Sequence, residues 1–339
     1  MVERAWQWLL SVVSVGVQVS AQEADAPLPV APPGPPPAAV QPIEVTFTSN
    51  RGGSLAIWSV PRTGGEPRRI TDGGSDVAPA WSPDGRTLAF HSHRSGGWKI
   101  WLVEFDADDR PGRARRLTDS GAGAFRYEYF PCWSPDGRQI AFERWNDAVG
   151  RFELCVIGRD GRGERTVGAG EGHDRQPSWS PDGRRLLFTS QRDGNAEIYV
   201  VDVEGGAAPQ NLSRSPAVDY AAAFAPDGER ILFHSDRGGR FATWTMAADG
   251  GDVRAFAPIT TDDHLQGWTD TESNTRSIPY RALRSTAGVW SADGTSVLAT
   301  TVRSGDEELC LLDASGGTPR RVIASNPARD FLPVFRPRQ

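Results

Sequence analysis

The stretch Trp81-Ser82-Pro83-Asp84-Gly85 decides the fold, because the chain returns to it again and again. Two copies are unchanged, two are altered at one or two positions, and a truncated copy, Phe335-Arg336-Pro337, stands near the C-terminus. The copies begin at residues 81, 133, 179, 224, 290 and 335. Most steps are therefore about 45 residues long, a period that indicates a structural repeat.

Each copy has the composition of a reverse turn. Proline sets φ for the second position of the turn, aspartate suits the third, and glycine adopts the positive φ that follows. Such a turn joins two antiparallel strands. A short β-rich run follows, such as Leu88-Ala89-Phe90, and then a polar loop, a third strand such as Lys99 to Leu102, and a poorer fourth strand such as Arg115 to Thr118. Four short strands per repeat predict an all-β propeller.

The two ends of the repeat region indicate how the ring closes. Val45 to Ser49 matches the second strand of a repeat and Leu55 to Val60 matches the third, but no first strand precedes them. The missing strand stands at the other end, where Pro333 to Pro337 aligns with Pro79 to Pro83. We therefore expect the C-terminal strand to complete the N-terminal blade and close a six-bladed ring without a free edge.

The pattern Asp-x-x-Pro-x-Trp-Ser-Pro-Asp-Gly, followed by Leu-Ala-Phe-x-Ser, resembles the six-bladed β-propeller of TolB and its relatives over residues 43–339. It lacks the Gly-His and Trp-Asp marks of WD-repeat propellers. TolB itself carries an α/β domain before its propeller, whereas residues 1–42 of this chain do not read as a domain. The resemblance implies a non-enzymatic role in assembling components of the cell envelope.

The N-terminal residues predict export. Ala5 to Val19 is apolar and Val19-Ser20-Ala21 offers small residues for cleavage, so residues 1–21 are interpreted as a secretory signal peptide; an uncleaved anchor is the alternative. Residues 22–42, rich in proline and alanine, form a spacer before the propeller. We expect a periplasmic or otherwise exported monomer with no membrane span in the mature chain. The net charge of −6 argues against nucleic-acid binding.

Motifs that carry chemistry are absent from the sequence. The three cysteines make no disulfide framework and have no Cys-x-x-Cys spacing. There is no nucleophile elbow, phosphate loop or zincin helix. His91 and His93 lie three repeats from His234, on opposite sides of the expected ring, so they are poorly placed to share a metal ion. We therefore predict no catalytic residue, no metal and no cofactor.

A carboxylate stands five residues before the aromatic residue of most repeats, at Asp76, Glu128, Asp174, Asp219 and Asp330. Arginines follow the second strands at Arg51, Arg94, Arg192, Arg237 and Arg303. Both positions belong to the same face of the disc, which we call the loop face. The regularity favours a structural ion pair in each blade. The alternative is an acidic ring that binds a cation or a basic peptide.

Departures from the repeat are more informative about binding. The loops of the third blade carry aromatic residues, among them Tyr129, and Tyr220 and Phe331 share its register in other blades. Residues 261–285 form an insertion that could act as a lid or grip. Aromatic and arginine side chains together are typical of the centre of an interface. The predicted partner-binding residues are Arg126, Tyr127, Tyr129, Trp145, Tyr220, Trp268 and Phe331. The alternative is that the aromatic side chains only cover the channel mouth.

The sequence thus predicts an exported, non-enzymatic scaffold that binds a protein or peptide partner in the cell envelope through its loop face. The rival is a carbohydrate binder or a polysaccharide lyase that uses the channel mouth. A lyase would need converging histidines and carboxylates, and a sugar binder would need exposed tryptophan, for which Trp145 and Trp268 are the candidates. A third hypothesis is a bare scaffold whose partner chain carries the activity.

Overall fold

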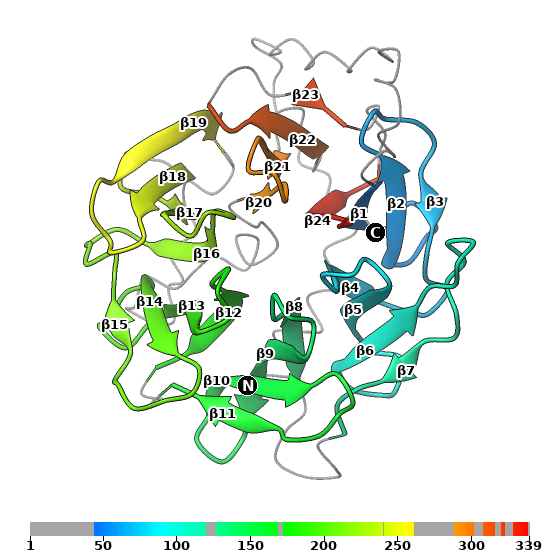
Figure 1. Cartoon of the computed structure of the whole chain (residues 1–339), viewed down its shortest axis with the longest axis horizontal. Coiled ribbons are helices and arrows are strands. Elements are labelled where there is room, and N and C mark those ends of the chain that lie inside the picture. The colour runs from blue at the N-terminus through cyan, green and yellow to red at the C-terminus, as the bar shows by residue number, and fades with distance from the viewer. Residues whose placement is uncertain are drawn as a thin grey trace, which may run out of the picture.

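The computed structural model describes residues 44–119, 127–168, 172–239, 241–260, 288–301, 308–315, 320–322 and 328–337. They form six four-stranded antiparallel sheets arranged in a ring (Figure 1). The predicted six-bladed all-β propeller is confirmed. The expected signal peptide, the linker, the insertion and residues Arg126, Trp268 and Arg303 lie outside the described part of the chain. Within that part, no helix is long and apolar enough to cross a membrane.

Each blade consists of four strands, which follow one another from the channel outward. Blade 1 holds β24 (Asp330–Phe335), β1 (Glu44–Ser49), β2 (Ala56–Pro61) and β3 (Arg68–Arg69), and blade 2 holds β4 (Asp76–Trp81), β5 (Thr87–Ser92), β6 (Lys99–Glu104) and β7 (Arg115–Arg116). Blade 3 holds β8 (Glu128–Trp133), β9 (Gln139–Asn146), β10 (Arg151–Gly158) and β11 (Arg165–Val167), and blade 4 holds β12 (Asp174–Trp179), β13 (Arg185–Ser190), β14 (Glu197–Asp202) and β15 (Gln210–Asn211). Blade 5 holds β16 (Asp219–Phe224), β17 (Arg230–Ser235), β18 (Ala242–Ala247) and β19 (Arg254–Thr260), and blade 6 holds β20 (Val289–Trp290), β21 (Ser296–Thr301), β22 (Glu308–Asp313) and β23 (Arg320–Arg321).

The ring closes as the repeat predicts. Strand β24 pairs antiparallel with β1, and Figure 1 shows the red C-terminal strand beside the dark blue N-terminal one. The Arg336 guanidinium that follows β24 lies over the ring of Trp81 at 4.6 Å and donates to the carbonyl of Gly85 in blade 2. The last strand is therefore attached to two blades at once.

The repeated turn is built as its residues require. Gly85 adopts φ of 65° and its N–H donates to the carbonyl of Ser82 at 2.8 Å. The Ser82 hydroxyl donates to Oδ1 of Asp84, which also accepts from the N–H of Arg86. The same serine-to-aspartate contact recurs in blades 3, 4 and 6. These hairpins lie on the face of the disc opposite the loop face.

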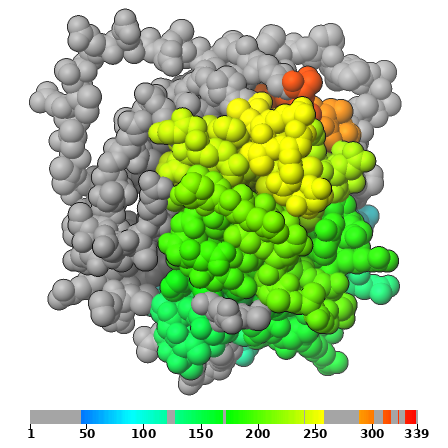
Figure 2. All heavy atoms as spheres, turned by 90° about the vertical axis from the view of Figure 1, so that its left-hand side faces the viewer, coloured from blue at the N-terminus to red at the C-terminus, as the bar shows by residue number. Residues whose placement is uncertain are grey.

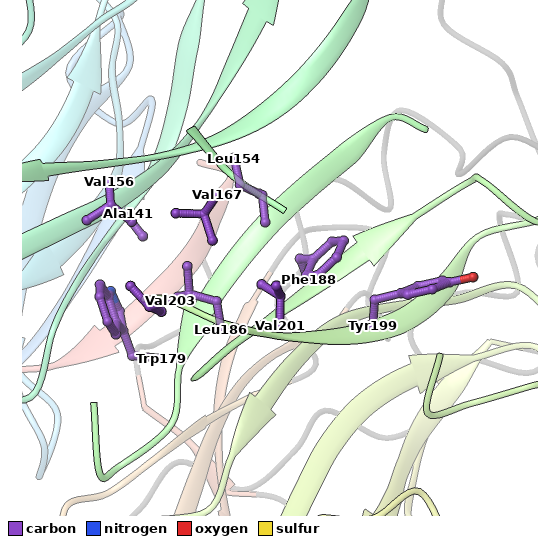
Figure 3. Close-up of a cluster of buried hydrophobic side chains, with 10 residues drawn as sticks. All are labelled: Ala141, Leu154, Val156, Val167, Trp179, Leu186, Phe188, Tyr199, Val201 and Val203. Atoms are coloured by element: carbon purple, nitrogen blue, oxygen red, sulfur yellow. The ribbon is translucent and has the colours of Figure 1, made fainter. Parts of the chain in front are cut away.

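The core lies between the blades, because each sheet is covered on both faces by its neighbours. In blade 3, Leu154 and Val156 of β10 point toward blade 4 and pack against side chains such as Trp179 and Leu186 (Figure 3). The alternate residue Cys155 points toward blade 2. Figure 2 shows the outer surfaces of blades 4 and 5, in green and yellow, which lie side by side. This packing makes the disc a rigid frame for its loops.

Candidate functional site

Four carboxylates of the predicted acidic ring are each paired with an arginine of the same blade. The nitrogen-to-oxygen distances are 2.7 Å for Arg51–Asp330, 2.6 Å for Arg94–Asp76, 3.0 Å for Arg192–Asp174 and 2.7 Å for Arg237–Asp219. The carboxylates are buried, and each arginine also donates to the serine at the end of the second strand. A buried carboxylate that lost its arginine would be strongly destabilising. The geometry therefore favours the structural interpretation of this ring.

Burial also changes the pKa values of two of these four carboxylates. It raises the pKa of Asp174 and of Asp219, although hydrogen bonds from a serine and the paired arginine act in the opposite direction. A carboxylate already neutralised within its own blade has little charge left for a cation or a basic peptide. The acidic ring is thus a poor candidate for the binding site.

Blade 3 departs from this scheme. Asn146 stands where other blades carry the arginine, and Glu128 instead contacts Lys99 of blade 2, whose Nζ lies 3.4 Å from Oε1. The hydroxyl of Thr118, also in blade 2, donates to the other oxygen of Glu128. Lys99 is the only lysine of the chain. The fifth carboxylate is therefore held by the neighbouring blade.

A second set of contacts between blades was not predicted from the sequence. The third residue of each innermost strand described in full has a positive φ, between 50° and 55° at Ala78, Phe130, Gln176, Ala221 and Leu332. In four of these the N–H donates to a side chain of the preceding blade. The acceptors are Thr48 for Ala78, His91 Nδ1 for Phe130, Glu143 for Gln176 and Thr189 for Ala221. Thr48, His91 and Thr189 each stand just before the last residue of a second strand. Glu143 has the same register in the longer β9, and this register could have signalled the role.

The hydrogen bond from the N–H of Phe130 explains why a histidine is buried at position 91. The imidazole is 4% exposed and is surrounded by the rings of Trp98, Tyr129 and Phe130. Burial lowers the pKa of His91 to about 3, so the ring is neutral and Nδ1 can accept. Its role in the described structure is to join blade 2 to blade 3. Within the described residues, no group of three or more His, Cys, Asp or Glu is arranged to hold a metal ion.

The symmetry break predicted for blade 3 is a group of aromatic side chains on the loop face, which we call the aromatic shelf. Strands β9 and β10 are longer than their counterparts in other blades, and their hairpin projects from this face. The backbone fixes the shelf, because Trp98 pairs with Tyr127 and the N–H of Trp145 donates to the carbonyl of Tyr127 at 2.9 Å. The shelf consists of Trp98, Tyr127, Trp145, Phe152 and His173.

Ring contacts hold these side chains in place. Trp145 stacks on His173 with centroids 6.0 Å apart and meets Phe152 edge-on at 5.1 Å. The N–H of Phe152 donates to His173 Nδ1, and the indole of Trp145 donates to Asp147 at 2.8 Å. All five side chains of the shelf are partly exposed. Partly exposed rings that are already immobilised lose little entropy when a partner covers them.

Three predicted interface residues are not on this surface. Tyr129, Tyr220 and Phe331 are 3%, 0% and 2% exposed, so the expectation that they face a partner is wrong. Tyr129 lies under the shelf against Tyr127, Tyr220 packs against Phe241, and Phe331 packs among residues of blade 2. They follow the first residue of an innermost strand, where a side chain points between blades. Of the predicted residues that are described, Tyr127 and Trp145 remain on the surface.

Two arginines, Arg151 and Arg175, adjoin the shelf, and sequence reasoning missed them. Arg175 lies over the Phe152 ring at 4.1 Å, but the buried carboxylate of Glu143 neutralises it. Arg151 has no hydrogen bond or ion pair among the described residues, and its Nε is buried. The pKa of His173 is lowered by burial and by the charges of Arg175 and Arg151. A site of this kind suits a ligand that brings a carboxylate to an aromatic surface.

The comparisons with known proteins agree with the architecture. A family model described as the TolB beta propeller domain matches residues 126–280. The matched residues are similar to the TolB beta propeller domain. The crystal structure of TolB from Acinetobacter baumannii superposes with a TM-score of 0.68, at 19% identity, over 87% of this chain and 67% of that one. At this identity the match shows the fold.

Two curated relatives match parts of the propeller. The protein TolB homolog of Chlorobium luteolum is 29% identical over 165 residues, which cover 47% of this chain and 34% of that protein. The uncharacterized peptidase YuxL of Bacillus subtilis is 40% identical over 104 residues, which cover 28% of this chain and 13% of that protein. The chain therefore spans about a third or less of the length of these relatives.

Proposed function

We propose that this TolB-like propeller is a non-enzymatic, exported module that binds a peptide segment of a partner protein on the aromatic shelf. The observation that carries the proposal is the set of partly exposed, stacked rings fixed by backbone pairing between Trp98, Tyr127 and Trp145. Interfaces concentrate binding energy in such rigid aromatic anchors. The relatives named TolB support a partner in the cell envelope and a periplasmic location.

The charge at the shelf narrows the partner. Arg151 has no hydrogen bond or ion pair among the described residues, and its field adds to that of Arg175 at His173. An extended segment with an acidic residue next to an aromatic or proline residue would satisfy both features, because its carboxylate pairs with the guanidinium while its ring covers the indole. The proposed ligand is thus an acidic peptide.

The test is binding of the full chain to a displayed library of twelve-residue peptides, followed by titration of the selected sequences. Trp145→Ala is expected to weaken binding at least tenfold without changing the melting temperature. Phe241→Ala is the matched control, because Phe241 is a partly exposed ring on the same face in blade 5. Arg151→Gln should abolish the preference for acidic peptides and the salt dependence of binding.

Equal losses of affinity in the Trp145 and Phe241 variants would contradict the assignment to the shelf. Selected peptides without acidic residues would contradict the role of Arg151. Capture of oligosaccharides in place of peptides, lost in Trp145→Ala, would favour the carbohydrate-binding rival. The YuxL relative raises a second function, in which the same shelf would hold a peptide for a peptidase unit. Hydrolysis of the selected peptide by the full chain would favour that function.

A further inference from the structure

The centre of the ring contains a cavity of about 340 Å³, and none of the shelf residues line it. Every innermost strand contributes to its wall, mostly with alanine, proline and other apolar side chains. No charged residue is among the described residues that line it. The cavity has the size and apolar character of small-molecule sites in proteins.

Two polar side chains of β12 interrupt this apolar wall. Gln176 and Ser178 both line the cavity, and Gln176 is only 8% exposed. Neither the Gln176 amide nitrogen nor the Ser178 hydroxyl has a hydrogen-bond partner among the described residues. Small-molecule pockets in proteins use a few such placed groups to orient an otherwise apolar ligand.

The orientation of the Gln176 amide follows from its neighbours. The Thr189 hydroxyl accepts from the N–H of Ala221 at 3.1 Å, and its own proton is donated to Oε1 of Gln176 at 3.2 Å. With its oxygen bound in this way, the NH₂ group is the part of the amide that remains for a ligand in the cavity that Gln176 lines. The backbone is also fixed, because Gln176 has φ of 54° and its N–H donates to Glu143. The donor is therefore held in place before any ligand arrives.

The wall also stays uncharged. Cys132 contributes to it, and burial raises the pKa of its thiol, which keeps the sulfur protonated. A charged ligand would lose its hydration in this cavity and find no partner of opposite charge among the described lining residues. A hydrocarbon would leave the Gln176 donor without a partner. The wall thus suits a ligand that is apolar, neutral and able to accept one hydrogen bond.

We propose that the channel is a second binding site, independent of the aromatic shelf, for a small uncharged apolar molecule whose carbonyl or ether oxygen accepts from the Gln176 amide. The test uses three probes of similar shape. Acetophenone has the acceptor, ethylbenzene lacks it, and benzoate adds a negative charge. Binding to the full chain is measured by calorimetry and by saturation-transfer NMR. Acetophenone is expected to bind more tightly than ethylbenzene, and benzoate is expected not to bind.

The chain itself supplies matched variants. Gln176→Leu removes the donor, and Leu332 adopts the same backbone conformation in blade 1 with φ of 51°. This variant should bind acetophenone about tenfold more weakly and ethylbenzene unchanged. Ala223→Val narrows the cavity. Valine already occupies this register in two other blades, at Val289 and Val334, and the change should weaken the binding of both probes.

Three results would overturn the proposal: no binding of acetophenone up to its solubility, equal affinity of acetophenone in the wild type and both variants, or binding of benzoate as tight as that of acetophenone. If Gln176→Leu does not fold, Gln176→Met removes the same donor with an unbranched side chain, and Ala223→Val still tests whether the probes occupy the cavity. The shelf variant Trp145→Ala should leave acetophenone binding intact.

Discussion

Replacing His91 with threonine should make the protein less sensitive to acid. In the folded chain burial lowers the pKa of His91 to about 3, whereas an unfolded histidine has a pKa of 6.5. Between these values the unfolded chain binds a proton that the folded chain does not, so stability is complete above pH 6.5 and falls as the pH decreases. Threonine does not titrate, and Thr48 and Thr189 already accept the equivalent bond in other blades.

The magnitude follows from the two pKa values. Lowering the pH from 7.5 to 4.5 should remove about 2.7 kcal/mol from the free energy of unfolding through His91 alone, at 1.36 kcal/mol per pH unit below 6.5. Thermodynamic linkage of the carboxylates and of the other histidines is common to both proteins. This shared contribution therefore cancels when the loss of unfolding free energy between pH 7.5 and 4.5 in His91→Thr is subtracted from the same loss in the wild type.

The assay is urea denaturation of both proteins at pH 7.5 and 4.5, read by tryptophan fluorescence. His91→Thr also leaves space where the imidazole was, which lowers stability at both pH values and cancels in the same difference. The expected result is a pH-dependent loss that is about 2.7 kcal/mol smaller in the variant. Equal losses in the two proteins would show that His91 is protonated in the folded state and would refute its role as a neutral acceptor.

Two further predictions concern the joints between blades. The indole of Trp133 donates to the carbonyl of Ala80 at 3.1 Å. Trp133→Phe removes this bond, so it should lower the free energy of unfolding in urea by about 1 to 2 kcal/mol more than Trp290→Phe does. The Trp290 indole nitrogen is buried without a hydrogen bond among the described residues, and equal costs would contradict the assignment. Removing residues 328–339 takes away β24 and its buried side chains. The expected loss of about 5 kcal/mol or more should abolish cooperative thermal unfolding, and an unchanged melting temperature would refute the closure of the ring.

The fold followed from the sequence because its signals are local and repeated. The turn Ser82-Pro83-Asp84-Gly85 fixes a hairpin by the φ preferences of its own residues, and six copies of one unit can bury their faces only by packing against one another. The closure by β24 was also predictable, because the strand missing at one end stands at the other. The ion pairs of the loop face could be anticipated for the same reason, since both partners recur once per repeat.

The binding surfaces were decided by the tertiary structure. In the sequence, Tyr127, Tyr129 and Trp145 are all aromatic residues of an irregular repeat. In the structure, Tyr129 is buried between His91 of blade 2 and Phe152 of blade 3, whereas the other two remain on the shelf. The role of His91 depends on a neighbouring amide that a bulge in β8 turns toward it. The channel donor of Gln176 depends on Thr189 and Ala221, which belong to two different blades. Local patterns record what a segment does by itself, whereas exposure and hydrogen-bond partners at these positions depend on how separate blades meet.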